Sequence, residues 1–202
     1  LLDLLNEILD FSKIEAGKLD IETVDFDLPG QVHDVVALLR ARLADKPVTI
    51  QTSLAVGEHH QVHGDPNRVR QVLLNILGNA VKFTPAGCVE LSISRISNEL
   101  VRFEVRDTGV GIPESHQALI FQPFEQGDGS TSRRFGGTGL GLAISRQLVG
   151  LMGGEIGFQS TLNQGSVFWF TVKLLAATGA GAGPPDAGTH DLSGHWKTSA
   201  RV

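Results

Sequence analysis

The sequence predicts a layered α/β domain, because segments with a strand period alternate with segments with a helix period from residue 20 to about residue 174. Hydrophobic residues make up 41% of the 202 residues and charged residues 19%, which is an ordinary globular composition. A chain of this length can bury one sizeable core, so we expect one main domain.

The first 19 residues carry a helix pattern of their own. Leu2, Leu5, Leu9, Ser12 and Ala16 follow one another at steps of three and four residues, as in the seam of a packed helix. A single helix of this length is marginal in water, so we expect it to pack against partner helices. The pattern is already running at the first residue, so we interpret the chain as a piece of a longer protein.

The α/β part is expected to hold seven strands and four helices. Alternating apolar residues predict strands at 23–27, 48–53, 61–63, 89–95, 101–107, 154–159 and 166–174. Apolar faces predict helices at 28–44, 66–83, 113–121 and 140–152. The segment 122–138 is rich in Gly, Ser and Thr and is expected to be a mobile loop, and 176–202 has the composition of a disordered linker.

Composition excludes several classes of protein. Seventeen Lys and Arg against 22 Asp and Glu leave a formal charge of -5, without the basic excess of a nucleic-acid binder. Cys88 stands alone and cannot form an internal disulfide, which favours a reducing cytoplasm. No apolar run approaches the ~20 residues of a membrane span, and no signal peptide is visible, so any anchor in the inner membrane would lie outside this chain.

The predicted helix 66–83 carries the first candidate site. Its polar face consists of Arg68, Gln71, Asn75, Asn79 and Lys82. An asparagine oxygen can coordinate Mg²⁺ that phosphates have already neutralised, and a lysine can meet a phosphate as a point charge. A solvated helix face explains the same stripe, so the stripe alone does not decide between them.

Two glycine-containing segments are further candidates. Asp107 to Ile112 (DTGVGI) follows a strand, where a carboxylate can accept a hydrogen bond from an exocyclic amine and glycines admit a planar base; a capped turn is the alternative. Gly136 to Leu142 (GGTGLGL) opens a helix whose N–H groups can face an anion; a flexible hinge is the alternative. Its spacing fits neither a P-loop nor a dinucleotide fingerprint.

Four motifs in this order resemble the sensor histidine kinases of two-component systems, within the wider group that shares the Bergerat ATP-binding fold. The residues 69–84 look like the family's N box, 107–112 its first glycine box, 121–126 its phenylalanine box and 136–142 its second glycine box. Residues 4–19 resemble the end of the second helix of the dimerisation and phosphotransfer domain of hybrid kinases. The resemblance covers about residues 1–175.

The resemblance implies a two-layer sandwich of a mixed β-sheet against helices, with an N-terminal helical stub. Residues 1–19 would be the truncated dimerisation helix, 20–175 the catalytic ATP-binding domain, and 176–202 a linker leading to a receiver domain. The implied partners are the phosphoacceptor domain of the same kinase, a downstream response-regulator receiver domain and, in the full-length protein, a second copy of the chain; no nucleic acid is implied.

The resemblance also implies a site for ATP and Mg²⁺. Asn79 would hold Mg²⁺, Asn75 and Lys82 would face the triphosphate, and Asp107 would read the adenine amine. The lid arginines Arg133 and Arg134 are candidates to reach the γ-phosphate. Gly109 and Gly111 would shape the adenine pocket, and Phe121 and Phe124 would anchor the base of the lid, with core packing as the alternative. The start of the following helix would meet the phosphates through Gly137, Thr138, Gly139, Leu140 and Gly141.

The implied activity is transfer of the γ-phosphoryl group to a histidine. ATP-hydrolysing relatives such as DNA gyrase carry Glu where this chain has Asn75, and an amide cannot act as a general base toward water, which favours the kinase. A degenerate nucleotide-binding module is a further alternative, against which the intact Asn79, Lys82 and Asp107 argue. Two lesser hypotheses are a metal site at His59, His60 and His63, and solvated linker histidines at His190 and His195.

The acceptor histidine of the family has no counterpart in this sequence. His33 and Asp34 imitate the His-acid motif, but they lie in the predicted helix 28–44 after the first strand, where a core or surface histidine is expected. We therefore expect the chain to bind ATP and not to phosphorylate itself.

Overall fold

The computed structural model describes residues 2–43, 46–56, 60–125 and 138–177. A five-stranded sheet has the order β2-β4-β5-β7-β6, in which β2 and β4 are parallel and the other pairs antiparallel. Its strands are β2 (Val48–Ala55), β4 (Gly87–Arg95), β5 (Leu100–Asp107), β6 (Ile156–Thr161) and β7 (Gly165–Lys173). A smaller antiparallel sheet has the order β1-β3-β8 and consists of Val24–Asp27, Gln61–Gly64 and Leu175–Ala176.

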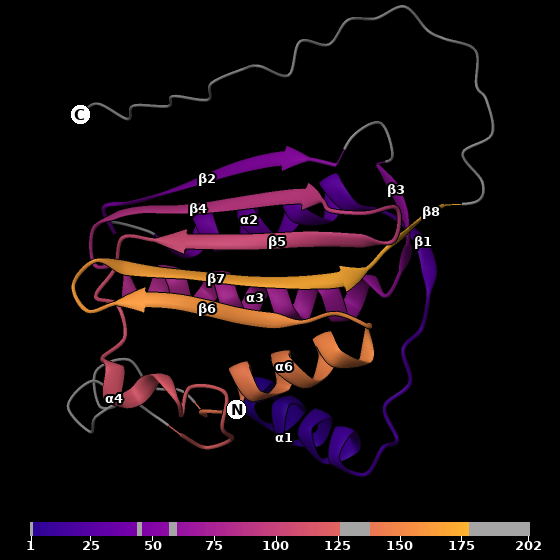
Figure 1. Cartoon of the computed structure of the whole chain (residues 1–202), viewed down its shortest axis with the longest axis horizontal. Coiled ribbons are helices and arrows are strands. Elements are labelled where there is room, and N and C mark those ends of the chain that lie inside the picture. Colours follow the sequence, from indigo (N-terminus) through magenta and orange to yellow (C-terminus); the bar gives the residue numbers. More distant parts are fainter. Residues whose placement is uncertain (1, 44–45, 57–59, 126–137, 178–202) are drawn as a thin grey trace, which may run out of the picture.

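Helices α2 (Leu28–Leu43) and α3 (Pro66–Phe83) cover one face of the large sheet, as Figure 1 shows. Helices α1 (Leu2–Glu15) and α6 (Gly141–Leu151) pack against each other beside them, and α4 (Glu114–Gln117) is a single turn. This arrangement confirms the expected α/β architecture of a mixed sheet layered against helices, with a helix at the N-terminus.

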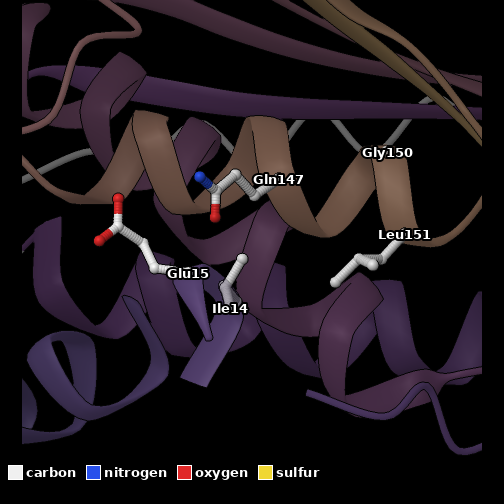
Figure 2. Close-up of a pocket in the computed structure, with 5 residues that line it drawn as sticks. All are labelled: Ile14, Glu15, Gln147, Gly150 and Leu151. Atoms are coloured by element: carbon white, nitrogen blue, oxygen red, sulfur yellow. The ribbon is translucent and has the colours of Figure 1, made fainter. Parts of the chain in front are cut away.

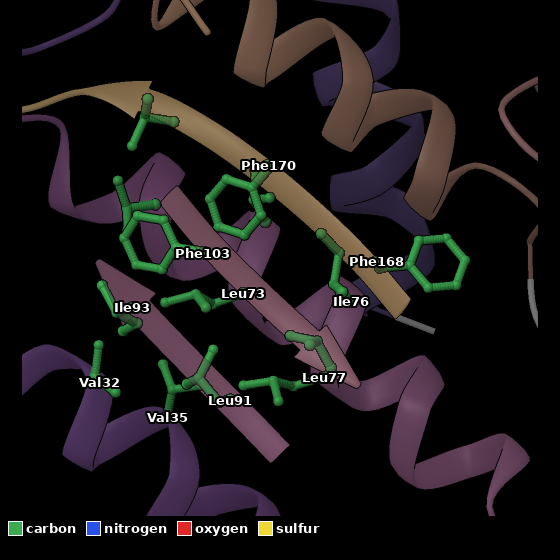
Figure 3. Close-up of a cluster of buried hydrophobic side chains, with 14 of the residues drawn as sticks. Val32, Val35, Leu73, Ile76, Leu77, Leu91, Ile93, Phe103, Phe168 and Phe170 are labelled. Carbon is green, nitrogen blue, oxygen red and sulfur yellow. The ribbon is translucent and has the colours of Figure 1, made fainter. Parts of the chain in front are cut away.

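The core lies between the sheet and the helices (Figure 3). The rings of Phe103 on β5 and Phe170 on β7 stack with centroids 4.6 Å apart, and both are fully buried. Burial of each such side chain contributes roughly 1.5–3 kcal/mol. Apolar residues of α3, α2 and β4 complete this layer: Leu73, Ile76, Leu77, Val32, Val35, Leu91 and Ile93.

The sequence defines α3 at both ends. Asp65 caps the first turn by accepting from the N–H of Arg68 at 3.0 Å, and Pro66 follows at a position where no amide hydrogen is needed. Thr84 has an extended backbone and ends the helix. Since α3 contacts α2, α6, β4 and β5, its polar face is placed with little freedom.

Helix α1 is attached to the rest of the molecule by one of its faces. The carboxylate of Asp10 accepts from Arg68 at 3.3 Å and from Gln71 at 2.8 Å, both on α3. The ring of Phe11 meets that of Phe124 edge to face at 6.1 Å. The predicted seam lies elsewhere on α1, where Leu5 and Leu9 remain exposed.

Most predicted elements agree with the structure to within one or two residues at each end, and two predictions differ in kind. The predicted helix 113–121 forms only at Glu114–Gln117, because the next amides, those of Leu119 and Gln122, bond to carbonyls three residues back and make successive turns. The expected linker begins too early, since Ala176 belongs to β8 and the N–H of Ala177 donates to Gln61 at 3.2 Å. The rest of that linker and residues 126–137 of the expected loop lie outside the described residues.

No helix within the described ranges is long and apolar enough to cross a membrane.

Candidate functional site

Three of the sequence motifs are joined along α3, which contacts the loop after β5 at its C-terminal end and the start of α6 near its middle. The backbone N–H of Val110, in the loop after β5, donates to the carbonyl of Phe83 at the end of α3, at 3.2 Å. The side-chain amide of Asn75 on α3 donates to the carbonyl of Gly141 at 3.1 Å and lies 3.2 Å from Oγ of Ser145, both on α6. The N box, the first glycine box and the second glycine box are therefore neighbours in space.

The polar face of α3 divides into two parts. Arg68 and Gln71, in its first turns, bond to each other at 2.9 Å and to Asp10 of α1, so they hold α1 against α3. The sequence prediction grouped these two residues with Asn75, Asn79 and Lys82 in one polar stripe, and the structure has them in contact with α1. Of the later residues, Asn75 bonds to the start of α6, and Asn79 and Lys82 follow it along the same helix face.

Asn79 and Lys82 are both half-buried. The side chain of Asn79 has no hydrogen-bond partner among the described residues, so its amide oxygen is accessible to a ligand. Burial lowers the pKa of the Lys82 ammonium, whose Nζ lies 5.0 Å from the centroid of the Phe83 ring. An oxygen donor and a partly desolvated cation thus stand three residues apart on one helix face.

Asp107, the last residue of β5, is buried at 6% exposure. Its Oδ1 accepts from the N–H of Gly109 at 2.8 Å. Burial raises the pKa of this carboxyl, and hydrogen bonds from Gly109 and Ser166 partly oppose the rise. Ser166, on β7 directly opposite Asp107, is a site neighbour that sequence reasoning missed, since strand pairing is not encoded locally.

The two glycines after Asp107 are needed for different reasons. A Cβ on Gly109 would lie 2.4 Å from the carbonyl oxygen of Phe83 and 2.8 Å from Oδ1 of Asp107. Gly111 has a φ of +65° and a Cβ there would lie 2.1 Å from the carbonyl oxygen of Thr161. Gly109 therefore packs within the site, whereas Gly111 joins the loop to the hairpin between β6 and β7.

The start of α6 is held by the residues before it. Phe124 donates its N–H to the carbonyl of Gly139 at 3.2 Å, and Gly139 has a φ of +73°. The N–H of Leu140 donates to Oγ1 of Thr138 at 3.0 Å. The structure thus brings the described part of the second glycine box to the phenylalanine box. Gly137, Arg133 and Arg134 lie outside the described residues.

The phenylalanine box makes contacts with two different helices. Phe121 meets Phe158 of β6 edge to face at 5.9 Å, and the guanidinium of Arg146 on α6 lies 5.8 Å from its centroid. Phe124 is 66% exposed and contacts Phe11 of α1. Phe121 is thus a packing residue, and Phe124 lies between the catalytic part and α1.

Two cavities lie near these residues, and neither is lined by residues of α3. A hollow of about 640 Å³ between α1 and α6 is lined by Ile14, Glu15, Gln147, Gly150 and Leu151 (Figure 2). A second, of about 220 Å³, lies at the ends of β5, β6 and β7, where Asp107 and Ser166 meet Arg106 and Gln159. Neither cavity is lined by Asn75, Asn79 or Lys82.

The alternative histidine sites find no support. Nδ1 of His63 lies 2.7 Å from Oδ1 of Asp25, an exposed pair on the small sheet, and within the described ranges no group of three metal-ligating side chains gathers. His59, His190 and His195 lie outside those ranges. His33 is exposed on α2.

The sequence of this chain is similar to the sequences of known proteins. Residues 64–176 match the family model described as histidine kinase-, DNA gyrase B- and HSP90-like ATPase. The signal transduction histidine-protein kinase BarA of Escherichia coli is 46% identical over 86% of this chain and 19% of its own length. The sensor histidine kinase AruS of Pseudomonas aeruginosa is 43% identical over 95% of this chain and 20% of its own length.

Solved structures lead to the same family. The crystal structure of full-length ShkA in complex with AMPPNP has a TM-score of 0.76 at 38% identity and covers 87% of this chain and 36% of that chain. The catalytic domain of the histidine kinase ThkA has a TM-score of 0.64 at 28% identity, covering 75% of this chain and 95% of that chain. The chain spans about a fifth of the length of the curated relatives that it matches. It belongs to the histidine kinase-, DNA gyrase B- and HSP90-like ATPase family.

Proposed function

We propose that this chain binds Mg-ATP along α3 and transfers its γ-phosphoryl group to a histidine on a dimerisation domain of the same kinase. The observation that carries this proposal is the bond from Asn75 to Gly141, because it joins the α3 residues to the start of α6. Residues 1–19 would then be the end of a dimerisation helix, 20–175 the catalytic domain, and the residues that follow a linker to a receiver domain.

Asp107 suits the adenine end of the site. An ionised carboxylate has about four acceptor positions, so Asp107 can accept from an exocyclic amine while Oδ1 still accepts from Gly109. The missing side chain of Gly109 keeps the space beside this carboxylate open, and the bond between Phe83 and Val110 holds the loop against α3. Burial excludes water from the carboxylate, which strengthens its discrimination between an amine and a carbonyl.

The triphosphate end would lie between α3 and α6. Lys82 supplies a positive charge. Within the described ranges no side chain caps the N-terminus of α6, so its first N–H groups can meet an anion. Lid arginines at 133 and 134 would add charge to the γ-phosphate, and Gly137 would let the chain approach it.

Mg²⁺ fits the donor set at Asn79. Magnesium is often held by one or two protein oxygens together with substrate phosphates and waters, and Asn79 presents one such oxygen without a competing partner in the described ranges. When bound, the ion would neutralise phosphate charge during transfer.

The geometry at Asn75 favours transfer over hydrolysis. Its amide N–H₂ donates to Gly141, and an amide has no basic site that could take a proton from water. Transfer to an imidazole needs positioning and charge neutralisation instead, because neutral histidine is already a nucleophile.

The exposed face of α1 supports a helical partner. Leu5, Ile8 and Leu9 are all exposed on a helix whose other face already packs against α3 and α6. We infer that the remainder of a helical hairpin covers this face and that two such hairpins pair in a homodimer. The single Cys88 suits a reducing cytoplasm, where we place this domain.

Phosphotransfer to a purified acceptor tests the proposal. Labelled ATP is incubated with Mg²⁺, the chain and a separate dimerisation domain that carries a His-acid motif, and acid-labile label on the acceptor is counted. We expect label on the acceptor and none on the chain alone, with Asn79→Ala abolishing transfer and Asn67→Ala, an exposed residue of the same helix, leaving it intact. Rapid release of phosphate without acceptor labelling would show a hydrolase instead.

A further inference from the structure

The C-terminal end of α3 is tied down by bonds to its last carbonyl groups. The final four carbonyls of a helix have no partner within it and need one from elsewhere. Here the carbonyl of Ala80 accepts from Oγ1 of Thr84 at 2.7 Å, and the carbonyl of Phe83 accepts from the N–H of Val110 at 3.2 Å. The two carbonyls between them are bound by a residue from a distant part of the chain.

That residue is Lys46, which lies between α2 and β2. Its Nζ donates to the carbonyl oxygens of Val81 and Lys82, the second at 3.1 Å. The backbone of Lys46 is fixed as well, because its N–H donates to Leu43 at 2.8 Å and its carbonyl accepts from Val48 at 2.7 Å. The ammonium group therefore reaches α3 from a fixed backbone, so its bonds to α3 cost little backbone conformational entropy.

The location suits a cation. The carbonyl end of a helix carries partial negative charge, which an ammonium group stabilises when it bonds the last carbonyls directly. Burial lowers the pKa of Lys46, so this ammonium is partly withdrawn from water and its bonds to the two carbonyls face less competition from solvent. It acts as a fixed clamp on the final turn of α3.

We propose that Lys46 is a positioning residue for the triphosphate half of the nucleotide site. It holds the backbone of Lys82, and with it the last turn that follows Asn79, without touching the nucleotide itself. This inference rests on the proposed function. No sequence motif contains Lys46, and its bonding partners lie 35 and 36 residues away along the chain.

The adenine half of the site is held by other bonds. Asp107 and Gly109 are bonded to each other at 2.8 Å, and Val110 reaches Phe83 without the help of Lys46. Loss of the clamp should therefore affect the contacts of the phosphates much more than those of the base. A general loss of folding would weaken both equally.

Binding of ATP and of adenosine to the chain with Lys46→Met separates these cases. Methionine keeps the apolar stem and removes the donor. We expect the dissociation constant of Mg-ATP to rise roughly tenfold, since small misplacements of binding groups can cost up to about 10²-fold. The dissociation constant of adenosine should change by less than about twofold, as expected for a half of the site whose bonds are unaltered. Amide hydrogen exchange at residues 81–84 should become faster, because the last turn loses its clamp.

Two further variants make the test decisive. Lys46→Arg keeps the charge and the donors and should recover most of the ATP affinity. Lys18→Met removes the same charge from an exposed residue near α1 and should bind ATP as the parent does. Lys46→Gln is measured alongside, so that a neutral donor is available if the methionine variant does not fold.

The outcomes separate this inference from the proposed function. Equal ATP affinity in the parent and in folded Lys46→Met would overturn the clamp alone, as would equal losses for ATP and adenosine. A parent chain that binds no ATP would overturn the proposed function and the clamp together.

Discussion

The side-chain amide of Asn75 donates a hydrogen bond to the carbonyl oxygen of Gly141, with 3.1 Å between nitrogen and oxygen. The same nitrogen lies 3.2 Å from Oγ of Ser145, whose hydroxyl itself donates to Gly141 at 2.8 Å. Asn75 must therefore present its N–H₂ group to α6 and its oxygen elsewhere. This direction of bonding ties α3 to the helix that begins with the second glycine box.

Asn75→Asp should weaken this connection. A carboxylate has no hydrogen to donate and would face the Gly141 carbonyl as a second acceptor, so we expect a loss of about 1–3 kcal/mol in the free energy of unfolding, measured in urea at neutral pH. Asn67→Asp is the matched control, since Asn67 is exposed in the first turn of α3, where negative charge is favourable. Equal stability of the two variants would mean that the bond to Gly141 contributes nothing.

Asn79→Ala should remove the magnesium-dependent part of ATP binding and leave the fold intact. A methyl group offers Mg²⁺ no oxygen, whereas the half-buried side chain loses no hydrogen bond to any described residue. Calorimetric titrations with ATP, with and without Mg²⁺, measure the difference. Asn67→Ala should keep the full magnesium effect, and an unchanged magnesium effect in Asn79→Ala would take this residue out of the metal site.

Much of this architecture was predictable because its signals are local. Helix α3 was predicted at its observed bounds, because Asp65 and Pro66 are residues typical of a helix start and its apolar residues recur at helical spacing. The strand ending at Asp107 was predicted from alternation, and the motifs around it from their order along the chain. These features depend on neighbours a few residues away, which periodicity and capping describe.

The remainder depends on contacts between distant residues. Arg68 and Gln71 have the same helical phase as site residues, yet their partner Asp10 lies 58 and 61 residues away. Periodicity identifies a helix face and does not say what covers it. Ala176 forms a strand because it pairs with Val62 of β3, and a two-residue strand is too short to show a strand period in the sequence. Ser166 and Lys46 were missed because their contacts, too, are with distant residues.

The contacts of α1 should be separable from nucleotide binding. Asp10→Ala removes the acceptor shared by Arg68 and Gln71, in an ion pair whose Arg68 and Asp10 side chains are only 23% and 20% exposed. The loss should weaken the attachment of α1 to α3. We expect faster tryptic cleavage after Lys13 and Lys18, with ATP affinity unchanged. Protection equal to that of the parent would indicate that the ring contact between Phe11 and Phe124 holds α1 by itself.

Gly109→Ala and Gly150→Ala should change stability in opposite directions. An added Cβ at Gly109 must displace the Phe83 carbonyl or the Asp107 carboxylate, at a cost of about 1–3 kcal/mol, and ATP binding should weaken with it. Gly150 lies in α6, and a Cβ there has no neighbouring atom within 4 Å, so Gly150→Ala should raise the free energy of unfolding by about 0.5–1 kcal/mol. Urea unfolding of both variants measures this, and a neutral Gly109→Ala would contradict the close packing of the loop against α3.

Asp107→Asn should abolish much of the ATP affinity while preserving the fold. The amide oxygen can still accept from Gly109, but the new N–H₂ group would face the adenine amine, and two donors cannot bond to each other. This mismatch should cost about 1–3 kcal/mol of binding free energy, or roughly 5- to 150-fold in affinity. Preference for ATP over GTP should fall with it. If the parent binds both nucleotides equally, Asp107 is not the adenine reader.

The pH dependence of stability gives a second test of Asp107. Burial raises the pKa of its carboxyl above the unfolded value of 3.8, so the folded state holds this proton more tightly. The resulting contribution to stability is complete below pH 3.8 and is lost as pH rises through the folded pKa. Asp107→Asn carries no such proton, so its stability relative to the parent should increase as pH rises across that window. Urea unfolding of both chains from pH 3.5 to 7 measures this difference. If the variant instead loses stability relative to the parent as pH rises, the hydrogen bonds to the Asp107 carboxylate stabilise it more than burial destabilises it.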